Sequence, residues 1–423
     1  MIKVLTHHEN RNFLRLWLAQ VISQFGDRIH QLALVGLMAE RFPGSRIELA
    51  KLMACTIIPV FFIQPIAGIF VDRWDRKTTL FVCDLIRCAL VLLIPFVFIY
   101  KTSMVPIYCL VFLIFSFSRF YVPAKMSIIP DLVTKDNLLS ANSLVTTTGM
   151  IAFVMGCALG GFLIDKFGAR NGFIIDAFTF LISGALIFSI DMPLKWRLNR
   201  KQILSRGREM LGTIKRSLWD EFKEGLAYLF QHKDIRLIIV MLSILFAAAG
   251  AIYVVLIVFI QESFKSVTKD LGVLAVCLGI GLFLGAILYG KYGKKFKWYN
   301  TIFFCLIFGG CMLVFFAYFV QHYPNIKMAM VLSGLLGLIV GPIFIATNTT
   351  IQIVSDESMR GKVFSALEVI IHLAFLLSMF LSSWLSKFVG CVWILIGVGI
   401  IFALVGIIGF IIAKLKGGFA FSQ

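Results

Sequence analysis

Ionisable side chains inside apolar stretches are the residues of this sequence that could do chemistry. Asp27 and His30 stand three apart in "FGDRIHQ", about fourteen residues into an apolar segment. On a helix this spacing places both on one face, near the middle of a bilayer. A carboxyl group at that depth suits a proton carrier. Alternatively, Asp27 is structural and is permanently neutralised by Arg119, Lys125 or another cation.

Two further pairs of charges lie in apolar segments. Arg119 and Lys125, in "FSRFYVPAKM", could hold an anionic group of a substrate or could hold Asp27. Lys125 could equally extend to the lipid headgroups, because it stands near the end of its segment. Asp84 and Arg87 are three apart, which favours a private ion pair within one helix.

Three more ionisable residues follow later in the chain. Asp176, in "FIIDAFTF", is expected to make a structural hydrogen bond. Glu368 and His372 are four apart and so share a helical face. They are either a second protonatable site or a buried pair that only packs its helix. Because charges in a membrane are costly, each of these residues is a functional candidate.

The composition explains why these charges lie in a membrane. Of 423 residues 60% are hydrophobic, only 15% are charged and 42 are Phe, which is more apolar surface than a soluble domain can bury. Several charge-free runs exceed the roughly 18 residues that cross a bilayer as a helix. The sequence therefore predicts an all-α, polytopic membrane protein with twelve transmembrane helices. They are expected at 13–38, 49–71, 78–100, 105–125, 139–164, 170–190, 236–261, 271–291, 299–320, 327–349, 363–386 and 390–413.

The loops orient these helices. Most of the 40 lysines and arginines fall in alternate loops, which places both termini in the cytoplasm and the protein in the cell (inner) membrane. This distribution, rather than nucleic-acid binding, accounts for the net charge of +18. We expect six-helix halves at 1–190 and 236–423, joined by a cytoplasmic linker at 191–235 with an amphipathic helix in "SLWDEFKEGLAYLFQH". Two such halves are typical of transporters.

Other classes of chemistry lack their motifs. The nine cysteines are read as small buried hydrophobes, with no metal-ligand spacing and no disulfide framework. No Walker loop, HExxH motif or nucleophile elbow occurs, which argues against direct use of ATP and against an intramembrane enzyme. No cofactor is expected. A receptor that does not transport would leave the charges in the membrane unexplained.

A charged loop carries a family resemblance. Gly68, Asp72, Arg73, Arg76 and Lys77 in "GIFVDRWDRK" resemble the loop motif of the major facilitator superfamily, and "GAILYGKYGKK" resembles its second-half copy without the aspartate. The resemblance implies that Asp72 meets a helix N-terminus or an arginine, while the basic residues meet acidic residues and headgroups, so that the loop latches the cytoplasmic side. The alternative is a short solvated loop that only obeys the positive-inside rule.

Longer segments resemble one branch of this family. "NFLRLWLAQVISQFGDRIHQLAL" and "TNTTIQIVSDESMRGKVFS" are similar to macrolide-efflux proteins and the enterobactin exporter. In the second segment, Glu357 and Arg360 are expected to cap a helix and to form ion pairs, on the side that faces the loop of the first half. The resemblance implies a monomeric, proton-coupled exporter that moves an amphipathic small molecule by alternating access, with protons and membrane lipid as its other partners. The lysophospholipid transporter branch shares "FGD" and "PAK", so lysophospholipid transport is the alternative.

Overall fold

A computed structural model describes most of the chain. The described residues are 11–71, 74–99, 103–134, 137–192, 233–266, 268–292, 298–354 and 360–415. Within these ranges the regular secondary structure is helical and no strand occurs, so the predicted all-α class is confirmed. Helices suit an apolar chain in a bilayer, because each satisfies its own backbone hydrogen bonds without water.

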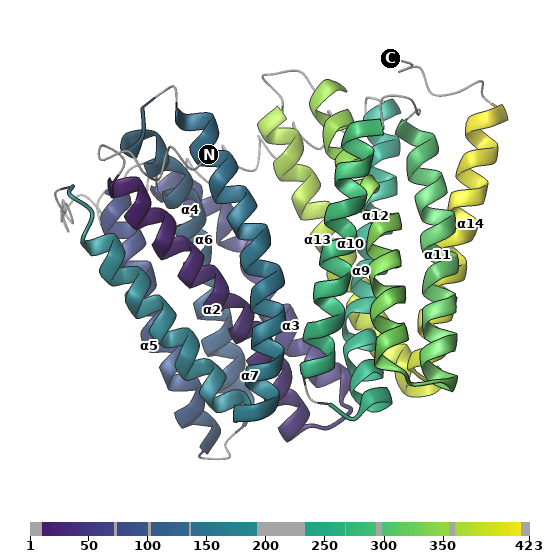
Figure 1. Cartoon of the computed structure of the whole chain (residues 1–423), viewed down its shortest axis with the longest axis horizontal. Coiled ribbons are helices and arrows are strands. Elements are labelled where there is room, and N and C mark those ends of the chain that lie inside the picture. Colours follow the sequence, from purple (N-terminus) through teal and green to yellow (C-terminus); the bar gives the residue numbers. More distant parts are fainter. Residues whose placement is uncertain are drawn as a thin grey trace. The chain divides into compact units, whose positions relative to one another are not determined.

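The first helices follow the predicted segments with three differences (Figure 1), one of which is that the predicted helix 105–125 continues to Leu132. The predicted helix 49–71 is two helices that meet at Ile63, and Pro65 accounts for the break because proline donates no backbone hydrogen bond. The predicted helices 139–164 and 170–190 form two arms of one element around Gly168, whose φ is 79°. The elements are α2 (Arg11–Arg41), α3 (Arg46–Phe62), α4 (Gln64–Val71), α5 (Arg76–Ile99), α6 (Val105–Leu132) and α7 (Leu138–Phe188).

The later helices each match one predicted segment, with bounds that differ by five residues or fewer. They are α9 (Lys233–Phe264), α10 (Lys269–Tyr292), α11 (Trp298–His322), α12 (Ile326–Val354), α13 (Arg360–Val389) and α14 (Cys391–Leu415). Among the described residues, nine helices are long and apolar enough to cross a membrane. The helix α2 is not one of them, and it carries the polar residues Gln20, Gln24, Asp27, Arg28 and Gln31.

The described residues form two compact units. Unit 1 comprises those within Met1–Pro43, Lys51–Met210 and Val267–Gly272, and unit 2 those within Gly44–Ala50, Leu211–Ser266 and Val273–Gln423. The expected division at 1–190, 191–235 and 236–423 stays a prediction. The predicted amphipathic helix of the linker lies outside the described residues.

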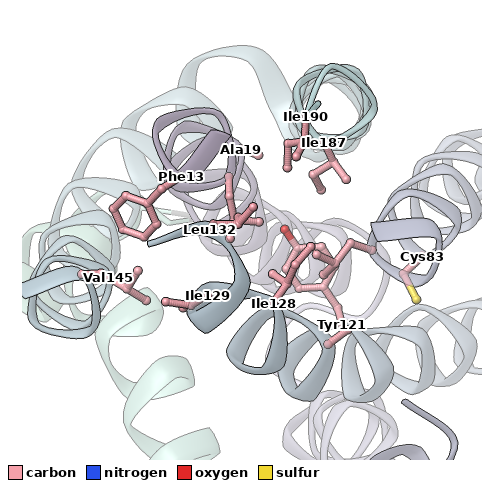
Figure 2. Close-up of a cluster of buried hydrophobic side chains, with 14 of the residues drawn as sticks. Phe13, Ala19, Cys83, Tyr121, Ile128, Ile129, Leu132, Val145, Ile187 and Ile190 are labelled. Atoms are coloured by element: carbon pink, nitrogen blue, oxygen red, sulfur yellow. The ribbon is translucent and has the colours of Figure 1, made fainter. Parts of the chain in front are cut away.

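In unit 1, α2 packs along α7, and α5 packs against both α6 and α7. Their shared core is a cluster of buried side chains from five helices, α2, α4, α5, α6 and α7 (Figure 2). It contains Phe13 and Ala19 of α2, Cys83 of α5, and Tyr121 of α6.

In unit 2, α11 packs against α12 and α14, and α13 packs against α9. Glycine allows α10 and α12 to approach each other closely. A Cβ atom added to Gly281 would lie 2.9 Å from the backbone nitrogen of Leu338 and closer still to the carbonyl oxygen of Gly334. The sequence "GIGLFLG" predicts such an approach, and the α10–α12 contact confirms it.

Candidate functional site

A buried ion pair on α5 is the centre of the polar site in unit 1. Asp84 and Arg87 contact each other, and their side chains are 0% and 2% exposed. The Ser183 hydroxyl on α7 donates a 2.6 Å hydrogen bond to Asp84. The Arg87 guanidinium carbon lies 4.5 Å from the ring centre of Tyr121 and 4.2 Å from that of Phe180. Pairing and aromatic contact on both sides compensate a charge that is costly to bury alone.

Asp27 of α2 extends this pair to a third helix. Its Oδ1 lies 3.9 Å from Nη1 of Arg87, and its side chain is 39% exposed. The expected ion pair between Asp84 and Arg87 is confirmed, but it is not private, because Arg87 serves two carboxylates. Asp27 has another cation as its nearest charge partner, as one sequence-based alternative allowed. It is the accessible carboxylate of the group, whereas Asp84 is closed off from solvent.

Lys125 of α6 is the fourth charge at this place. Its side chain is buried, and it interacts electrostatically with both Asp27 and Arg87. Burial argues against the expectation that it extends to the lipid headgroups. Arg119 lies on the same helix and is half-buried. The structure thus brings Asp27, Arg87 and Lys125 together from α2, α5 and α6.

His30 faces a different partner from Asp27, although the two are only three residues apart. Nδ1 of His30 lies 3.0 Å from Oδ2 of Asp176 on α7, and both side chains are buried. The Thr179 hydroxyl donates to the other Asp176 oxygen at 3.3 Å, which confirms the expected structural hydrogen bond. Edge-to-face contact with Phe173 holds the imidazole ring. The helix α2 therefore presents two separate polar contacts to its neighbours.

Gly26 makes room for this second contact. A Cβ atom at residue 26 would lie 2.5 Å from Oδ1 of Asp176 and 2.8 Å from Cβ of Thr179. Only glycine lets α2 approach α7 this closely without a clash. The glycine of "FGD" thus has a packing role, while the aspartate next to it points towards Arg87.

In unit 2 the predicted Glu368–His372 pair has a simple local geometry. Nδ1 of His372 lies 2.8 Å from the backbone carbonyl oxygen of Glu368, one turn earlier on α13. The imidazole ring also approaches Phe246 of α9, with ring centres 6.4 Å apart. Its assignment as a second protonatable site stays a prediction.

The start of α5 holds the described part of the charged loop. Arg76 pairs with Asp131 of α6 at 2.5 Å, as expected of a basic residue meeting an acidic one. Lys77 differs, because its ammonium donates to the backbone carbonyls of Ile190 and Met192 at 2.7 and 2.8 Å. The two carbonyls lie just beyond the C-terminal end of α7 at Phe188, and that of Ile190 also accepts a hydrogen bond from the Met192 N–H. Both contacts lie within unit 1.

The other predicted latch residues are only partly visible. Asp72, Arg73 and Glu357 lie outside the described residues. Gly68 lies in α4, and Arg360 begins α13. A latching role for the loop stays a prediction.

The sequence pattern did not single out Tyr121, Phe180 or Ser183. It named Arg87, but assigned it to a local pair. The available signal was the arginine itself, because a guanidinium in an apolar helix needs partners on neighbouring helices. Which helices supply those partners depends on packing that apolar sequences do not specify.

Comparisons with known proteins agree with this architecture. The sequence pattern of the Major Facilitator Superfamily matches residues 16–320 and residues 238–417. The uncharacterized MFS-type transporter YkuC of Bacillus subtilis is 27% identical over 412 residues, which cover 95% of this chain and 92% of that protein. Macrolide efflux protein A of Streptococcus pyogenes is 22% identical over 382 residues, which cover 89% of this chain and 90% of that protein.

Solved transporter structures share the fold. A bacterial homologue of the iron transporter ferroportin, in its inward-facing state, aligns with a TM-score of 0.70 at 13% identity, covering 94% of this chain and 98% of that one. A point mutant of the nucleoside transporter NupG aligns with a TM-score of 0.65 at 16% identity, covering 94% of this chain and 100% of that one. At these identities the likeness concerns the fold alone.

Proposed function

Because the chain belongs to the Major Facilitator Superfamily, we propose that it is a proton-coupled exporter of amphipathic small molecules that works by alternating access. Asp27 is the residue that binds and releases the proton. The substrate leaves the cell as protons enter, and no cofactor takes part.

The accessible position of Asp27 beside Arg87 carries this proposal. A carboxylate that exchanges protons needs contact with water and a charge that compensates its ionised form. Asp27 has the compensating charge, since it lies 3.9 Å from the guanidinium, and 39% of its side chain is left uncovered by the described residues. Asp84 cannot serve in the same way, because its side chain is 0% exposed and contacts the same arginine. Arg87 thus keeps its positive charge beside Asp27, whether the carboxyl group of Asp27 is protonated or ionised.

The substrate class rests on resemblance and composition. Macrolide efflux protein A, a relative across most of the chain, is named for export of an amphipathic drug. The apolar and aromatic composition of the helices suits such ligands. None of the relatives named above is described as a lysophospholipid transporter, so that alternative has no support from them and is not carried forward.

The orientation follows from charge. With both termini in the cytoplasm, the lysine- and arginine-rich loops face the side that the positive-inside rule requires. We place the chain in the inner membrane as a monomer. Protein fused to either terminus should therefore be shielded from externally added protease in intact cells.

Proton movement in everted membrane vesicles tests the function. The vesicles are acidified by respiration, and ethidium, erythromycin or a catecholate siderophore is added while a fluorescent dye reports the internal pH. We expect at least one compound to dissipate the gradient with wild-type protein and to fail with Asp27→Asn. Asp165→Asn is the matched control, because Asp165 is an exposed aspartate on α7.

Three results would contradict the proposal. Equal proton release by wild type and Asp27→Asn would remove Asp27 from the coupling. Uptake of the same compounds that survives a protonophore would remove proton coupling itself. Loss of release in both aspartate variants would mean that the effect of Asp27→Asn is not specific to its position.

A further inference from the structure

We propose that Lys125 is the binding residue for a single anionic group on an amphipathic ligand, such as a carboxylate, sulfonate or phosphate. The proposal deepens the transport function and rests on it, since the ligand would be the exported substrate. Binding through Lys125 nevertheless requires no proton gradient, so it can be tested separately from coupling.

The first observation is that Lys125 is buried without a close partner. Its side chain is 8% exposed. Within the ranges that the structure describes, its ammonium makes no hydrogen bond and has no carboxylate oxygen within 4.0 Å. A largely buried lysine without a close counter-charge is destabilised relative to water. An anion that approached it would offset part of that destabilisation.

The second observation is an uneven distribution of partners among the charges on the helices of unit 1. Asp27 and Asp84 both face Arg87, and Asp176 faces His30. Each of these carboxylates therefore already has a cation or an imidazole. None of the three is close enough to Lys125 to form an ion pair.

Arg28 is a second cation in these helices that has no carboxylate partner among the described residues. Its guanidinium donates to the neutral amide oxygen of Gln31 at 2.9 Å and lies 4.6 Å from the ring centre of Phe153. Like Lys125, it has no carboxylate within ion-pair distance among the described residues. Positive charge in these helices thus exceeds the negative charge placed to meet it, and a negative ligand is the complement.

The neighbours of Lys125 on α6 are apolar or aromatic. Tyr121 and Ile128, one turn before it and one turn after it, belong to the buried core (Figure 2), and so does Ala124. An ammonium is a compact point charge rather than a bidentate fork, so it recognises negative charge without selecting one geometry. Carboxylates, sulfonates and phosphates are therefore all acceptable, whether they belong to a soluble amphiphile or to a lipid headgroup.

Three matched probes test the charge preference. Pyrenebutyrate, pyrenebutanol and pyrenebutylamine share one hydrocarbon and differ mainly in their charge. Their dissociation constants are measured at pH 7.5 on full-length protein in phosphatidylcholine nanodiscs, with the signal of empty nanodiscs subtracted. The variants are Lys125→Met, Lys125→Arg and Lys166→Met. Lys166 is the matched control because it is an exposed lysine on α7.

Wild type should bind the acid about tenfold more tightly than the alcohol, as expected of one charge-assisted hydrogen bond. In Lys125→Met the acid and the alcohol should bind equally, with the alcohol unchanged from wild type, which also shows that the variant is folded. Lys125→Arg should keep the preference because it keeps the charge, and so should Lys166→Met.

Two outcomes overturn the proposal: a preference for the acid that survives in Lys125→Met, or tighter binding of the amine than of the acid by wild type. A parallel arm with phosphatidylglycerol in the nanodiscs identifies the source of the anion. Competition by this lipid assigns the site to a headgroup, and its absence assigns the site to a soluble amphiphile. Failure of the exporter proposal would instead appear as absent proton release, with the binding preference intact.

Discussion

The guanidinium of Arg87 reaches Asp27 on another helix, with Nη1 3.9 Å from Oδ1, while it also contacts Asp84 on its own helix. One buried cation thus serves a closed carboxylate and an accessible one. In this arrangement Asp84 has a structural role, whereas Asp27 is placed to exchange a proton. The arrangement also makes the accessible carboxylate depend on the integrity of the buried pair.

Asp84→Asn should strongly destabilise the protein. The substitution removes the closest counter-charge from a guanidinium that is 2% exposed, and breaking a buried pair costs about 3–5 kcal/mol. The double variant Asp84→Asn, Arg87→Met should recover most of that loss, because no unpaired charge remains at the pair. Thermal unfolding in detergent measures both. If the double variant is no more stable than the single one, the unpaired charge of Arg87 is not the cause of the lost stability.

Gly26→Ala should disrupt the packing of α2 on α7. The added methyl group would lie 2.5 Å from Oδ1 of Asp176, in a place where backbone and side chains are tightly held. Overpacking of this kind costs about 1–3 kcal/mol. Gly149→Ala is the control, since its nearest contact is the flexible Gln24 side chain at 3.1 Å. Equal unfolding temperatures for the two variants would contradict the packing argument.

Lys77→Met should destabilise the protein more than Arg76→Ala does. Lys77 is 4% exposed and donates to two backbone carbonyls, and a hydrogen bond from a charged group contributes about 1.5–3 kcal/mol. Arg76 and Asp131 are both partly exposed, and such surface pairs contribute about 0–1 kcal/mol. Unfolding temperatures of the two variants decide the order. The reverse order would point to a stronger role for Arg76 outside these contacts.

His30 and Asp176 should be energetically coupled. Because their facing atoms are 3.0 Å apart and both side chains are buried, a double-mutant cycle with His30→Gln and Asp176→Asn should give a coupling energy of about 0.5–3 kcal/mol. Unfolding in detergent supplies the four stabilities. The same cycle between His30 and Asp27 should give a value near zero, as the two side chains have different partners. Similar values in both cycles would contradict that separation.

Much of the fold could be predicted from hydropathy and charge, because a bilayer restricts an apolar chain to helices. The helix ends followed charged and polar breaks, and the second-half helices differed from their predicted bounds by five residues or fewer. Two of the three exceptions in the first half have local causes. Pro65 interrupts one segment, and the backbone at Gly168 joins two segments into one element.

The sequence could predict which charged residues belong to the candidate site, but not which residues they contact. Asp27, His30 and Lys125 stood out because charge in an apolar helix is costly wherever it occurs. Their partners did not, and the spacing of Asp27 and His30 suggested one shared face rather than two separate contacts. Lys77, expected to meet an acidic residue, binds carbonyls more than one hundred positions away in the chain.

The sequence by itself determined the class of protein, the positions of its helices and the identity of its embedded charges, since hydropathy and charge act locally along the chain. Only the tertiary structure decided that Arg87 is shared, that His30 faces Asp176 and that Lys125 is buried without a close partner. The reason is that membrane helices are apolar on nearly every face, so periodicity does not reveal which face meets which neighbour. Packing between helices distant in sequence makes that choice.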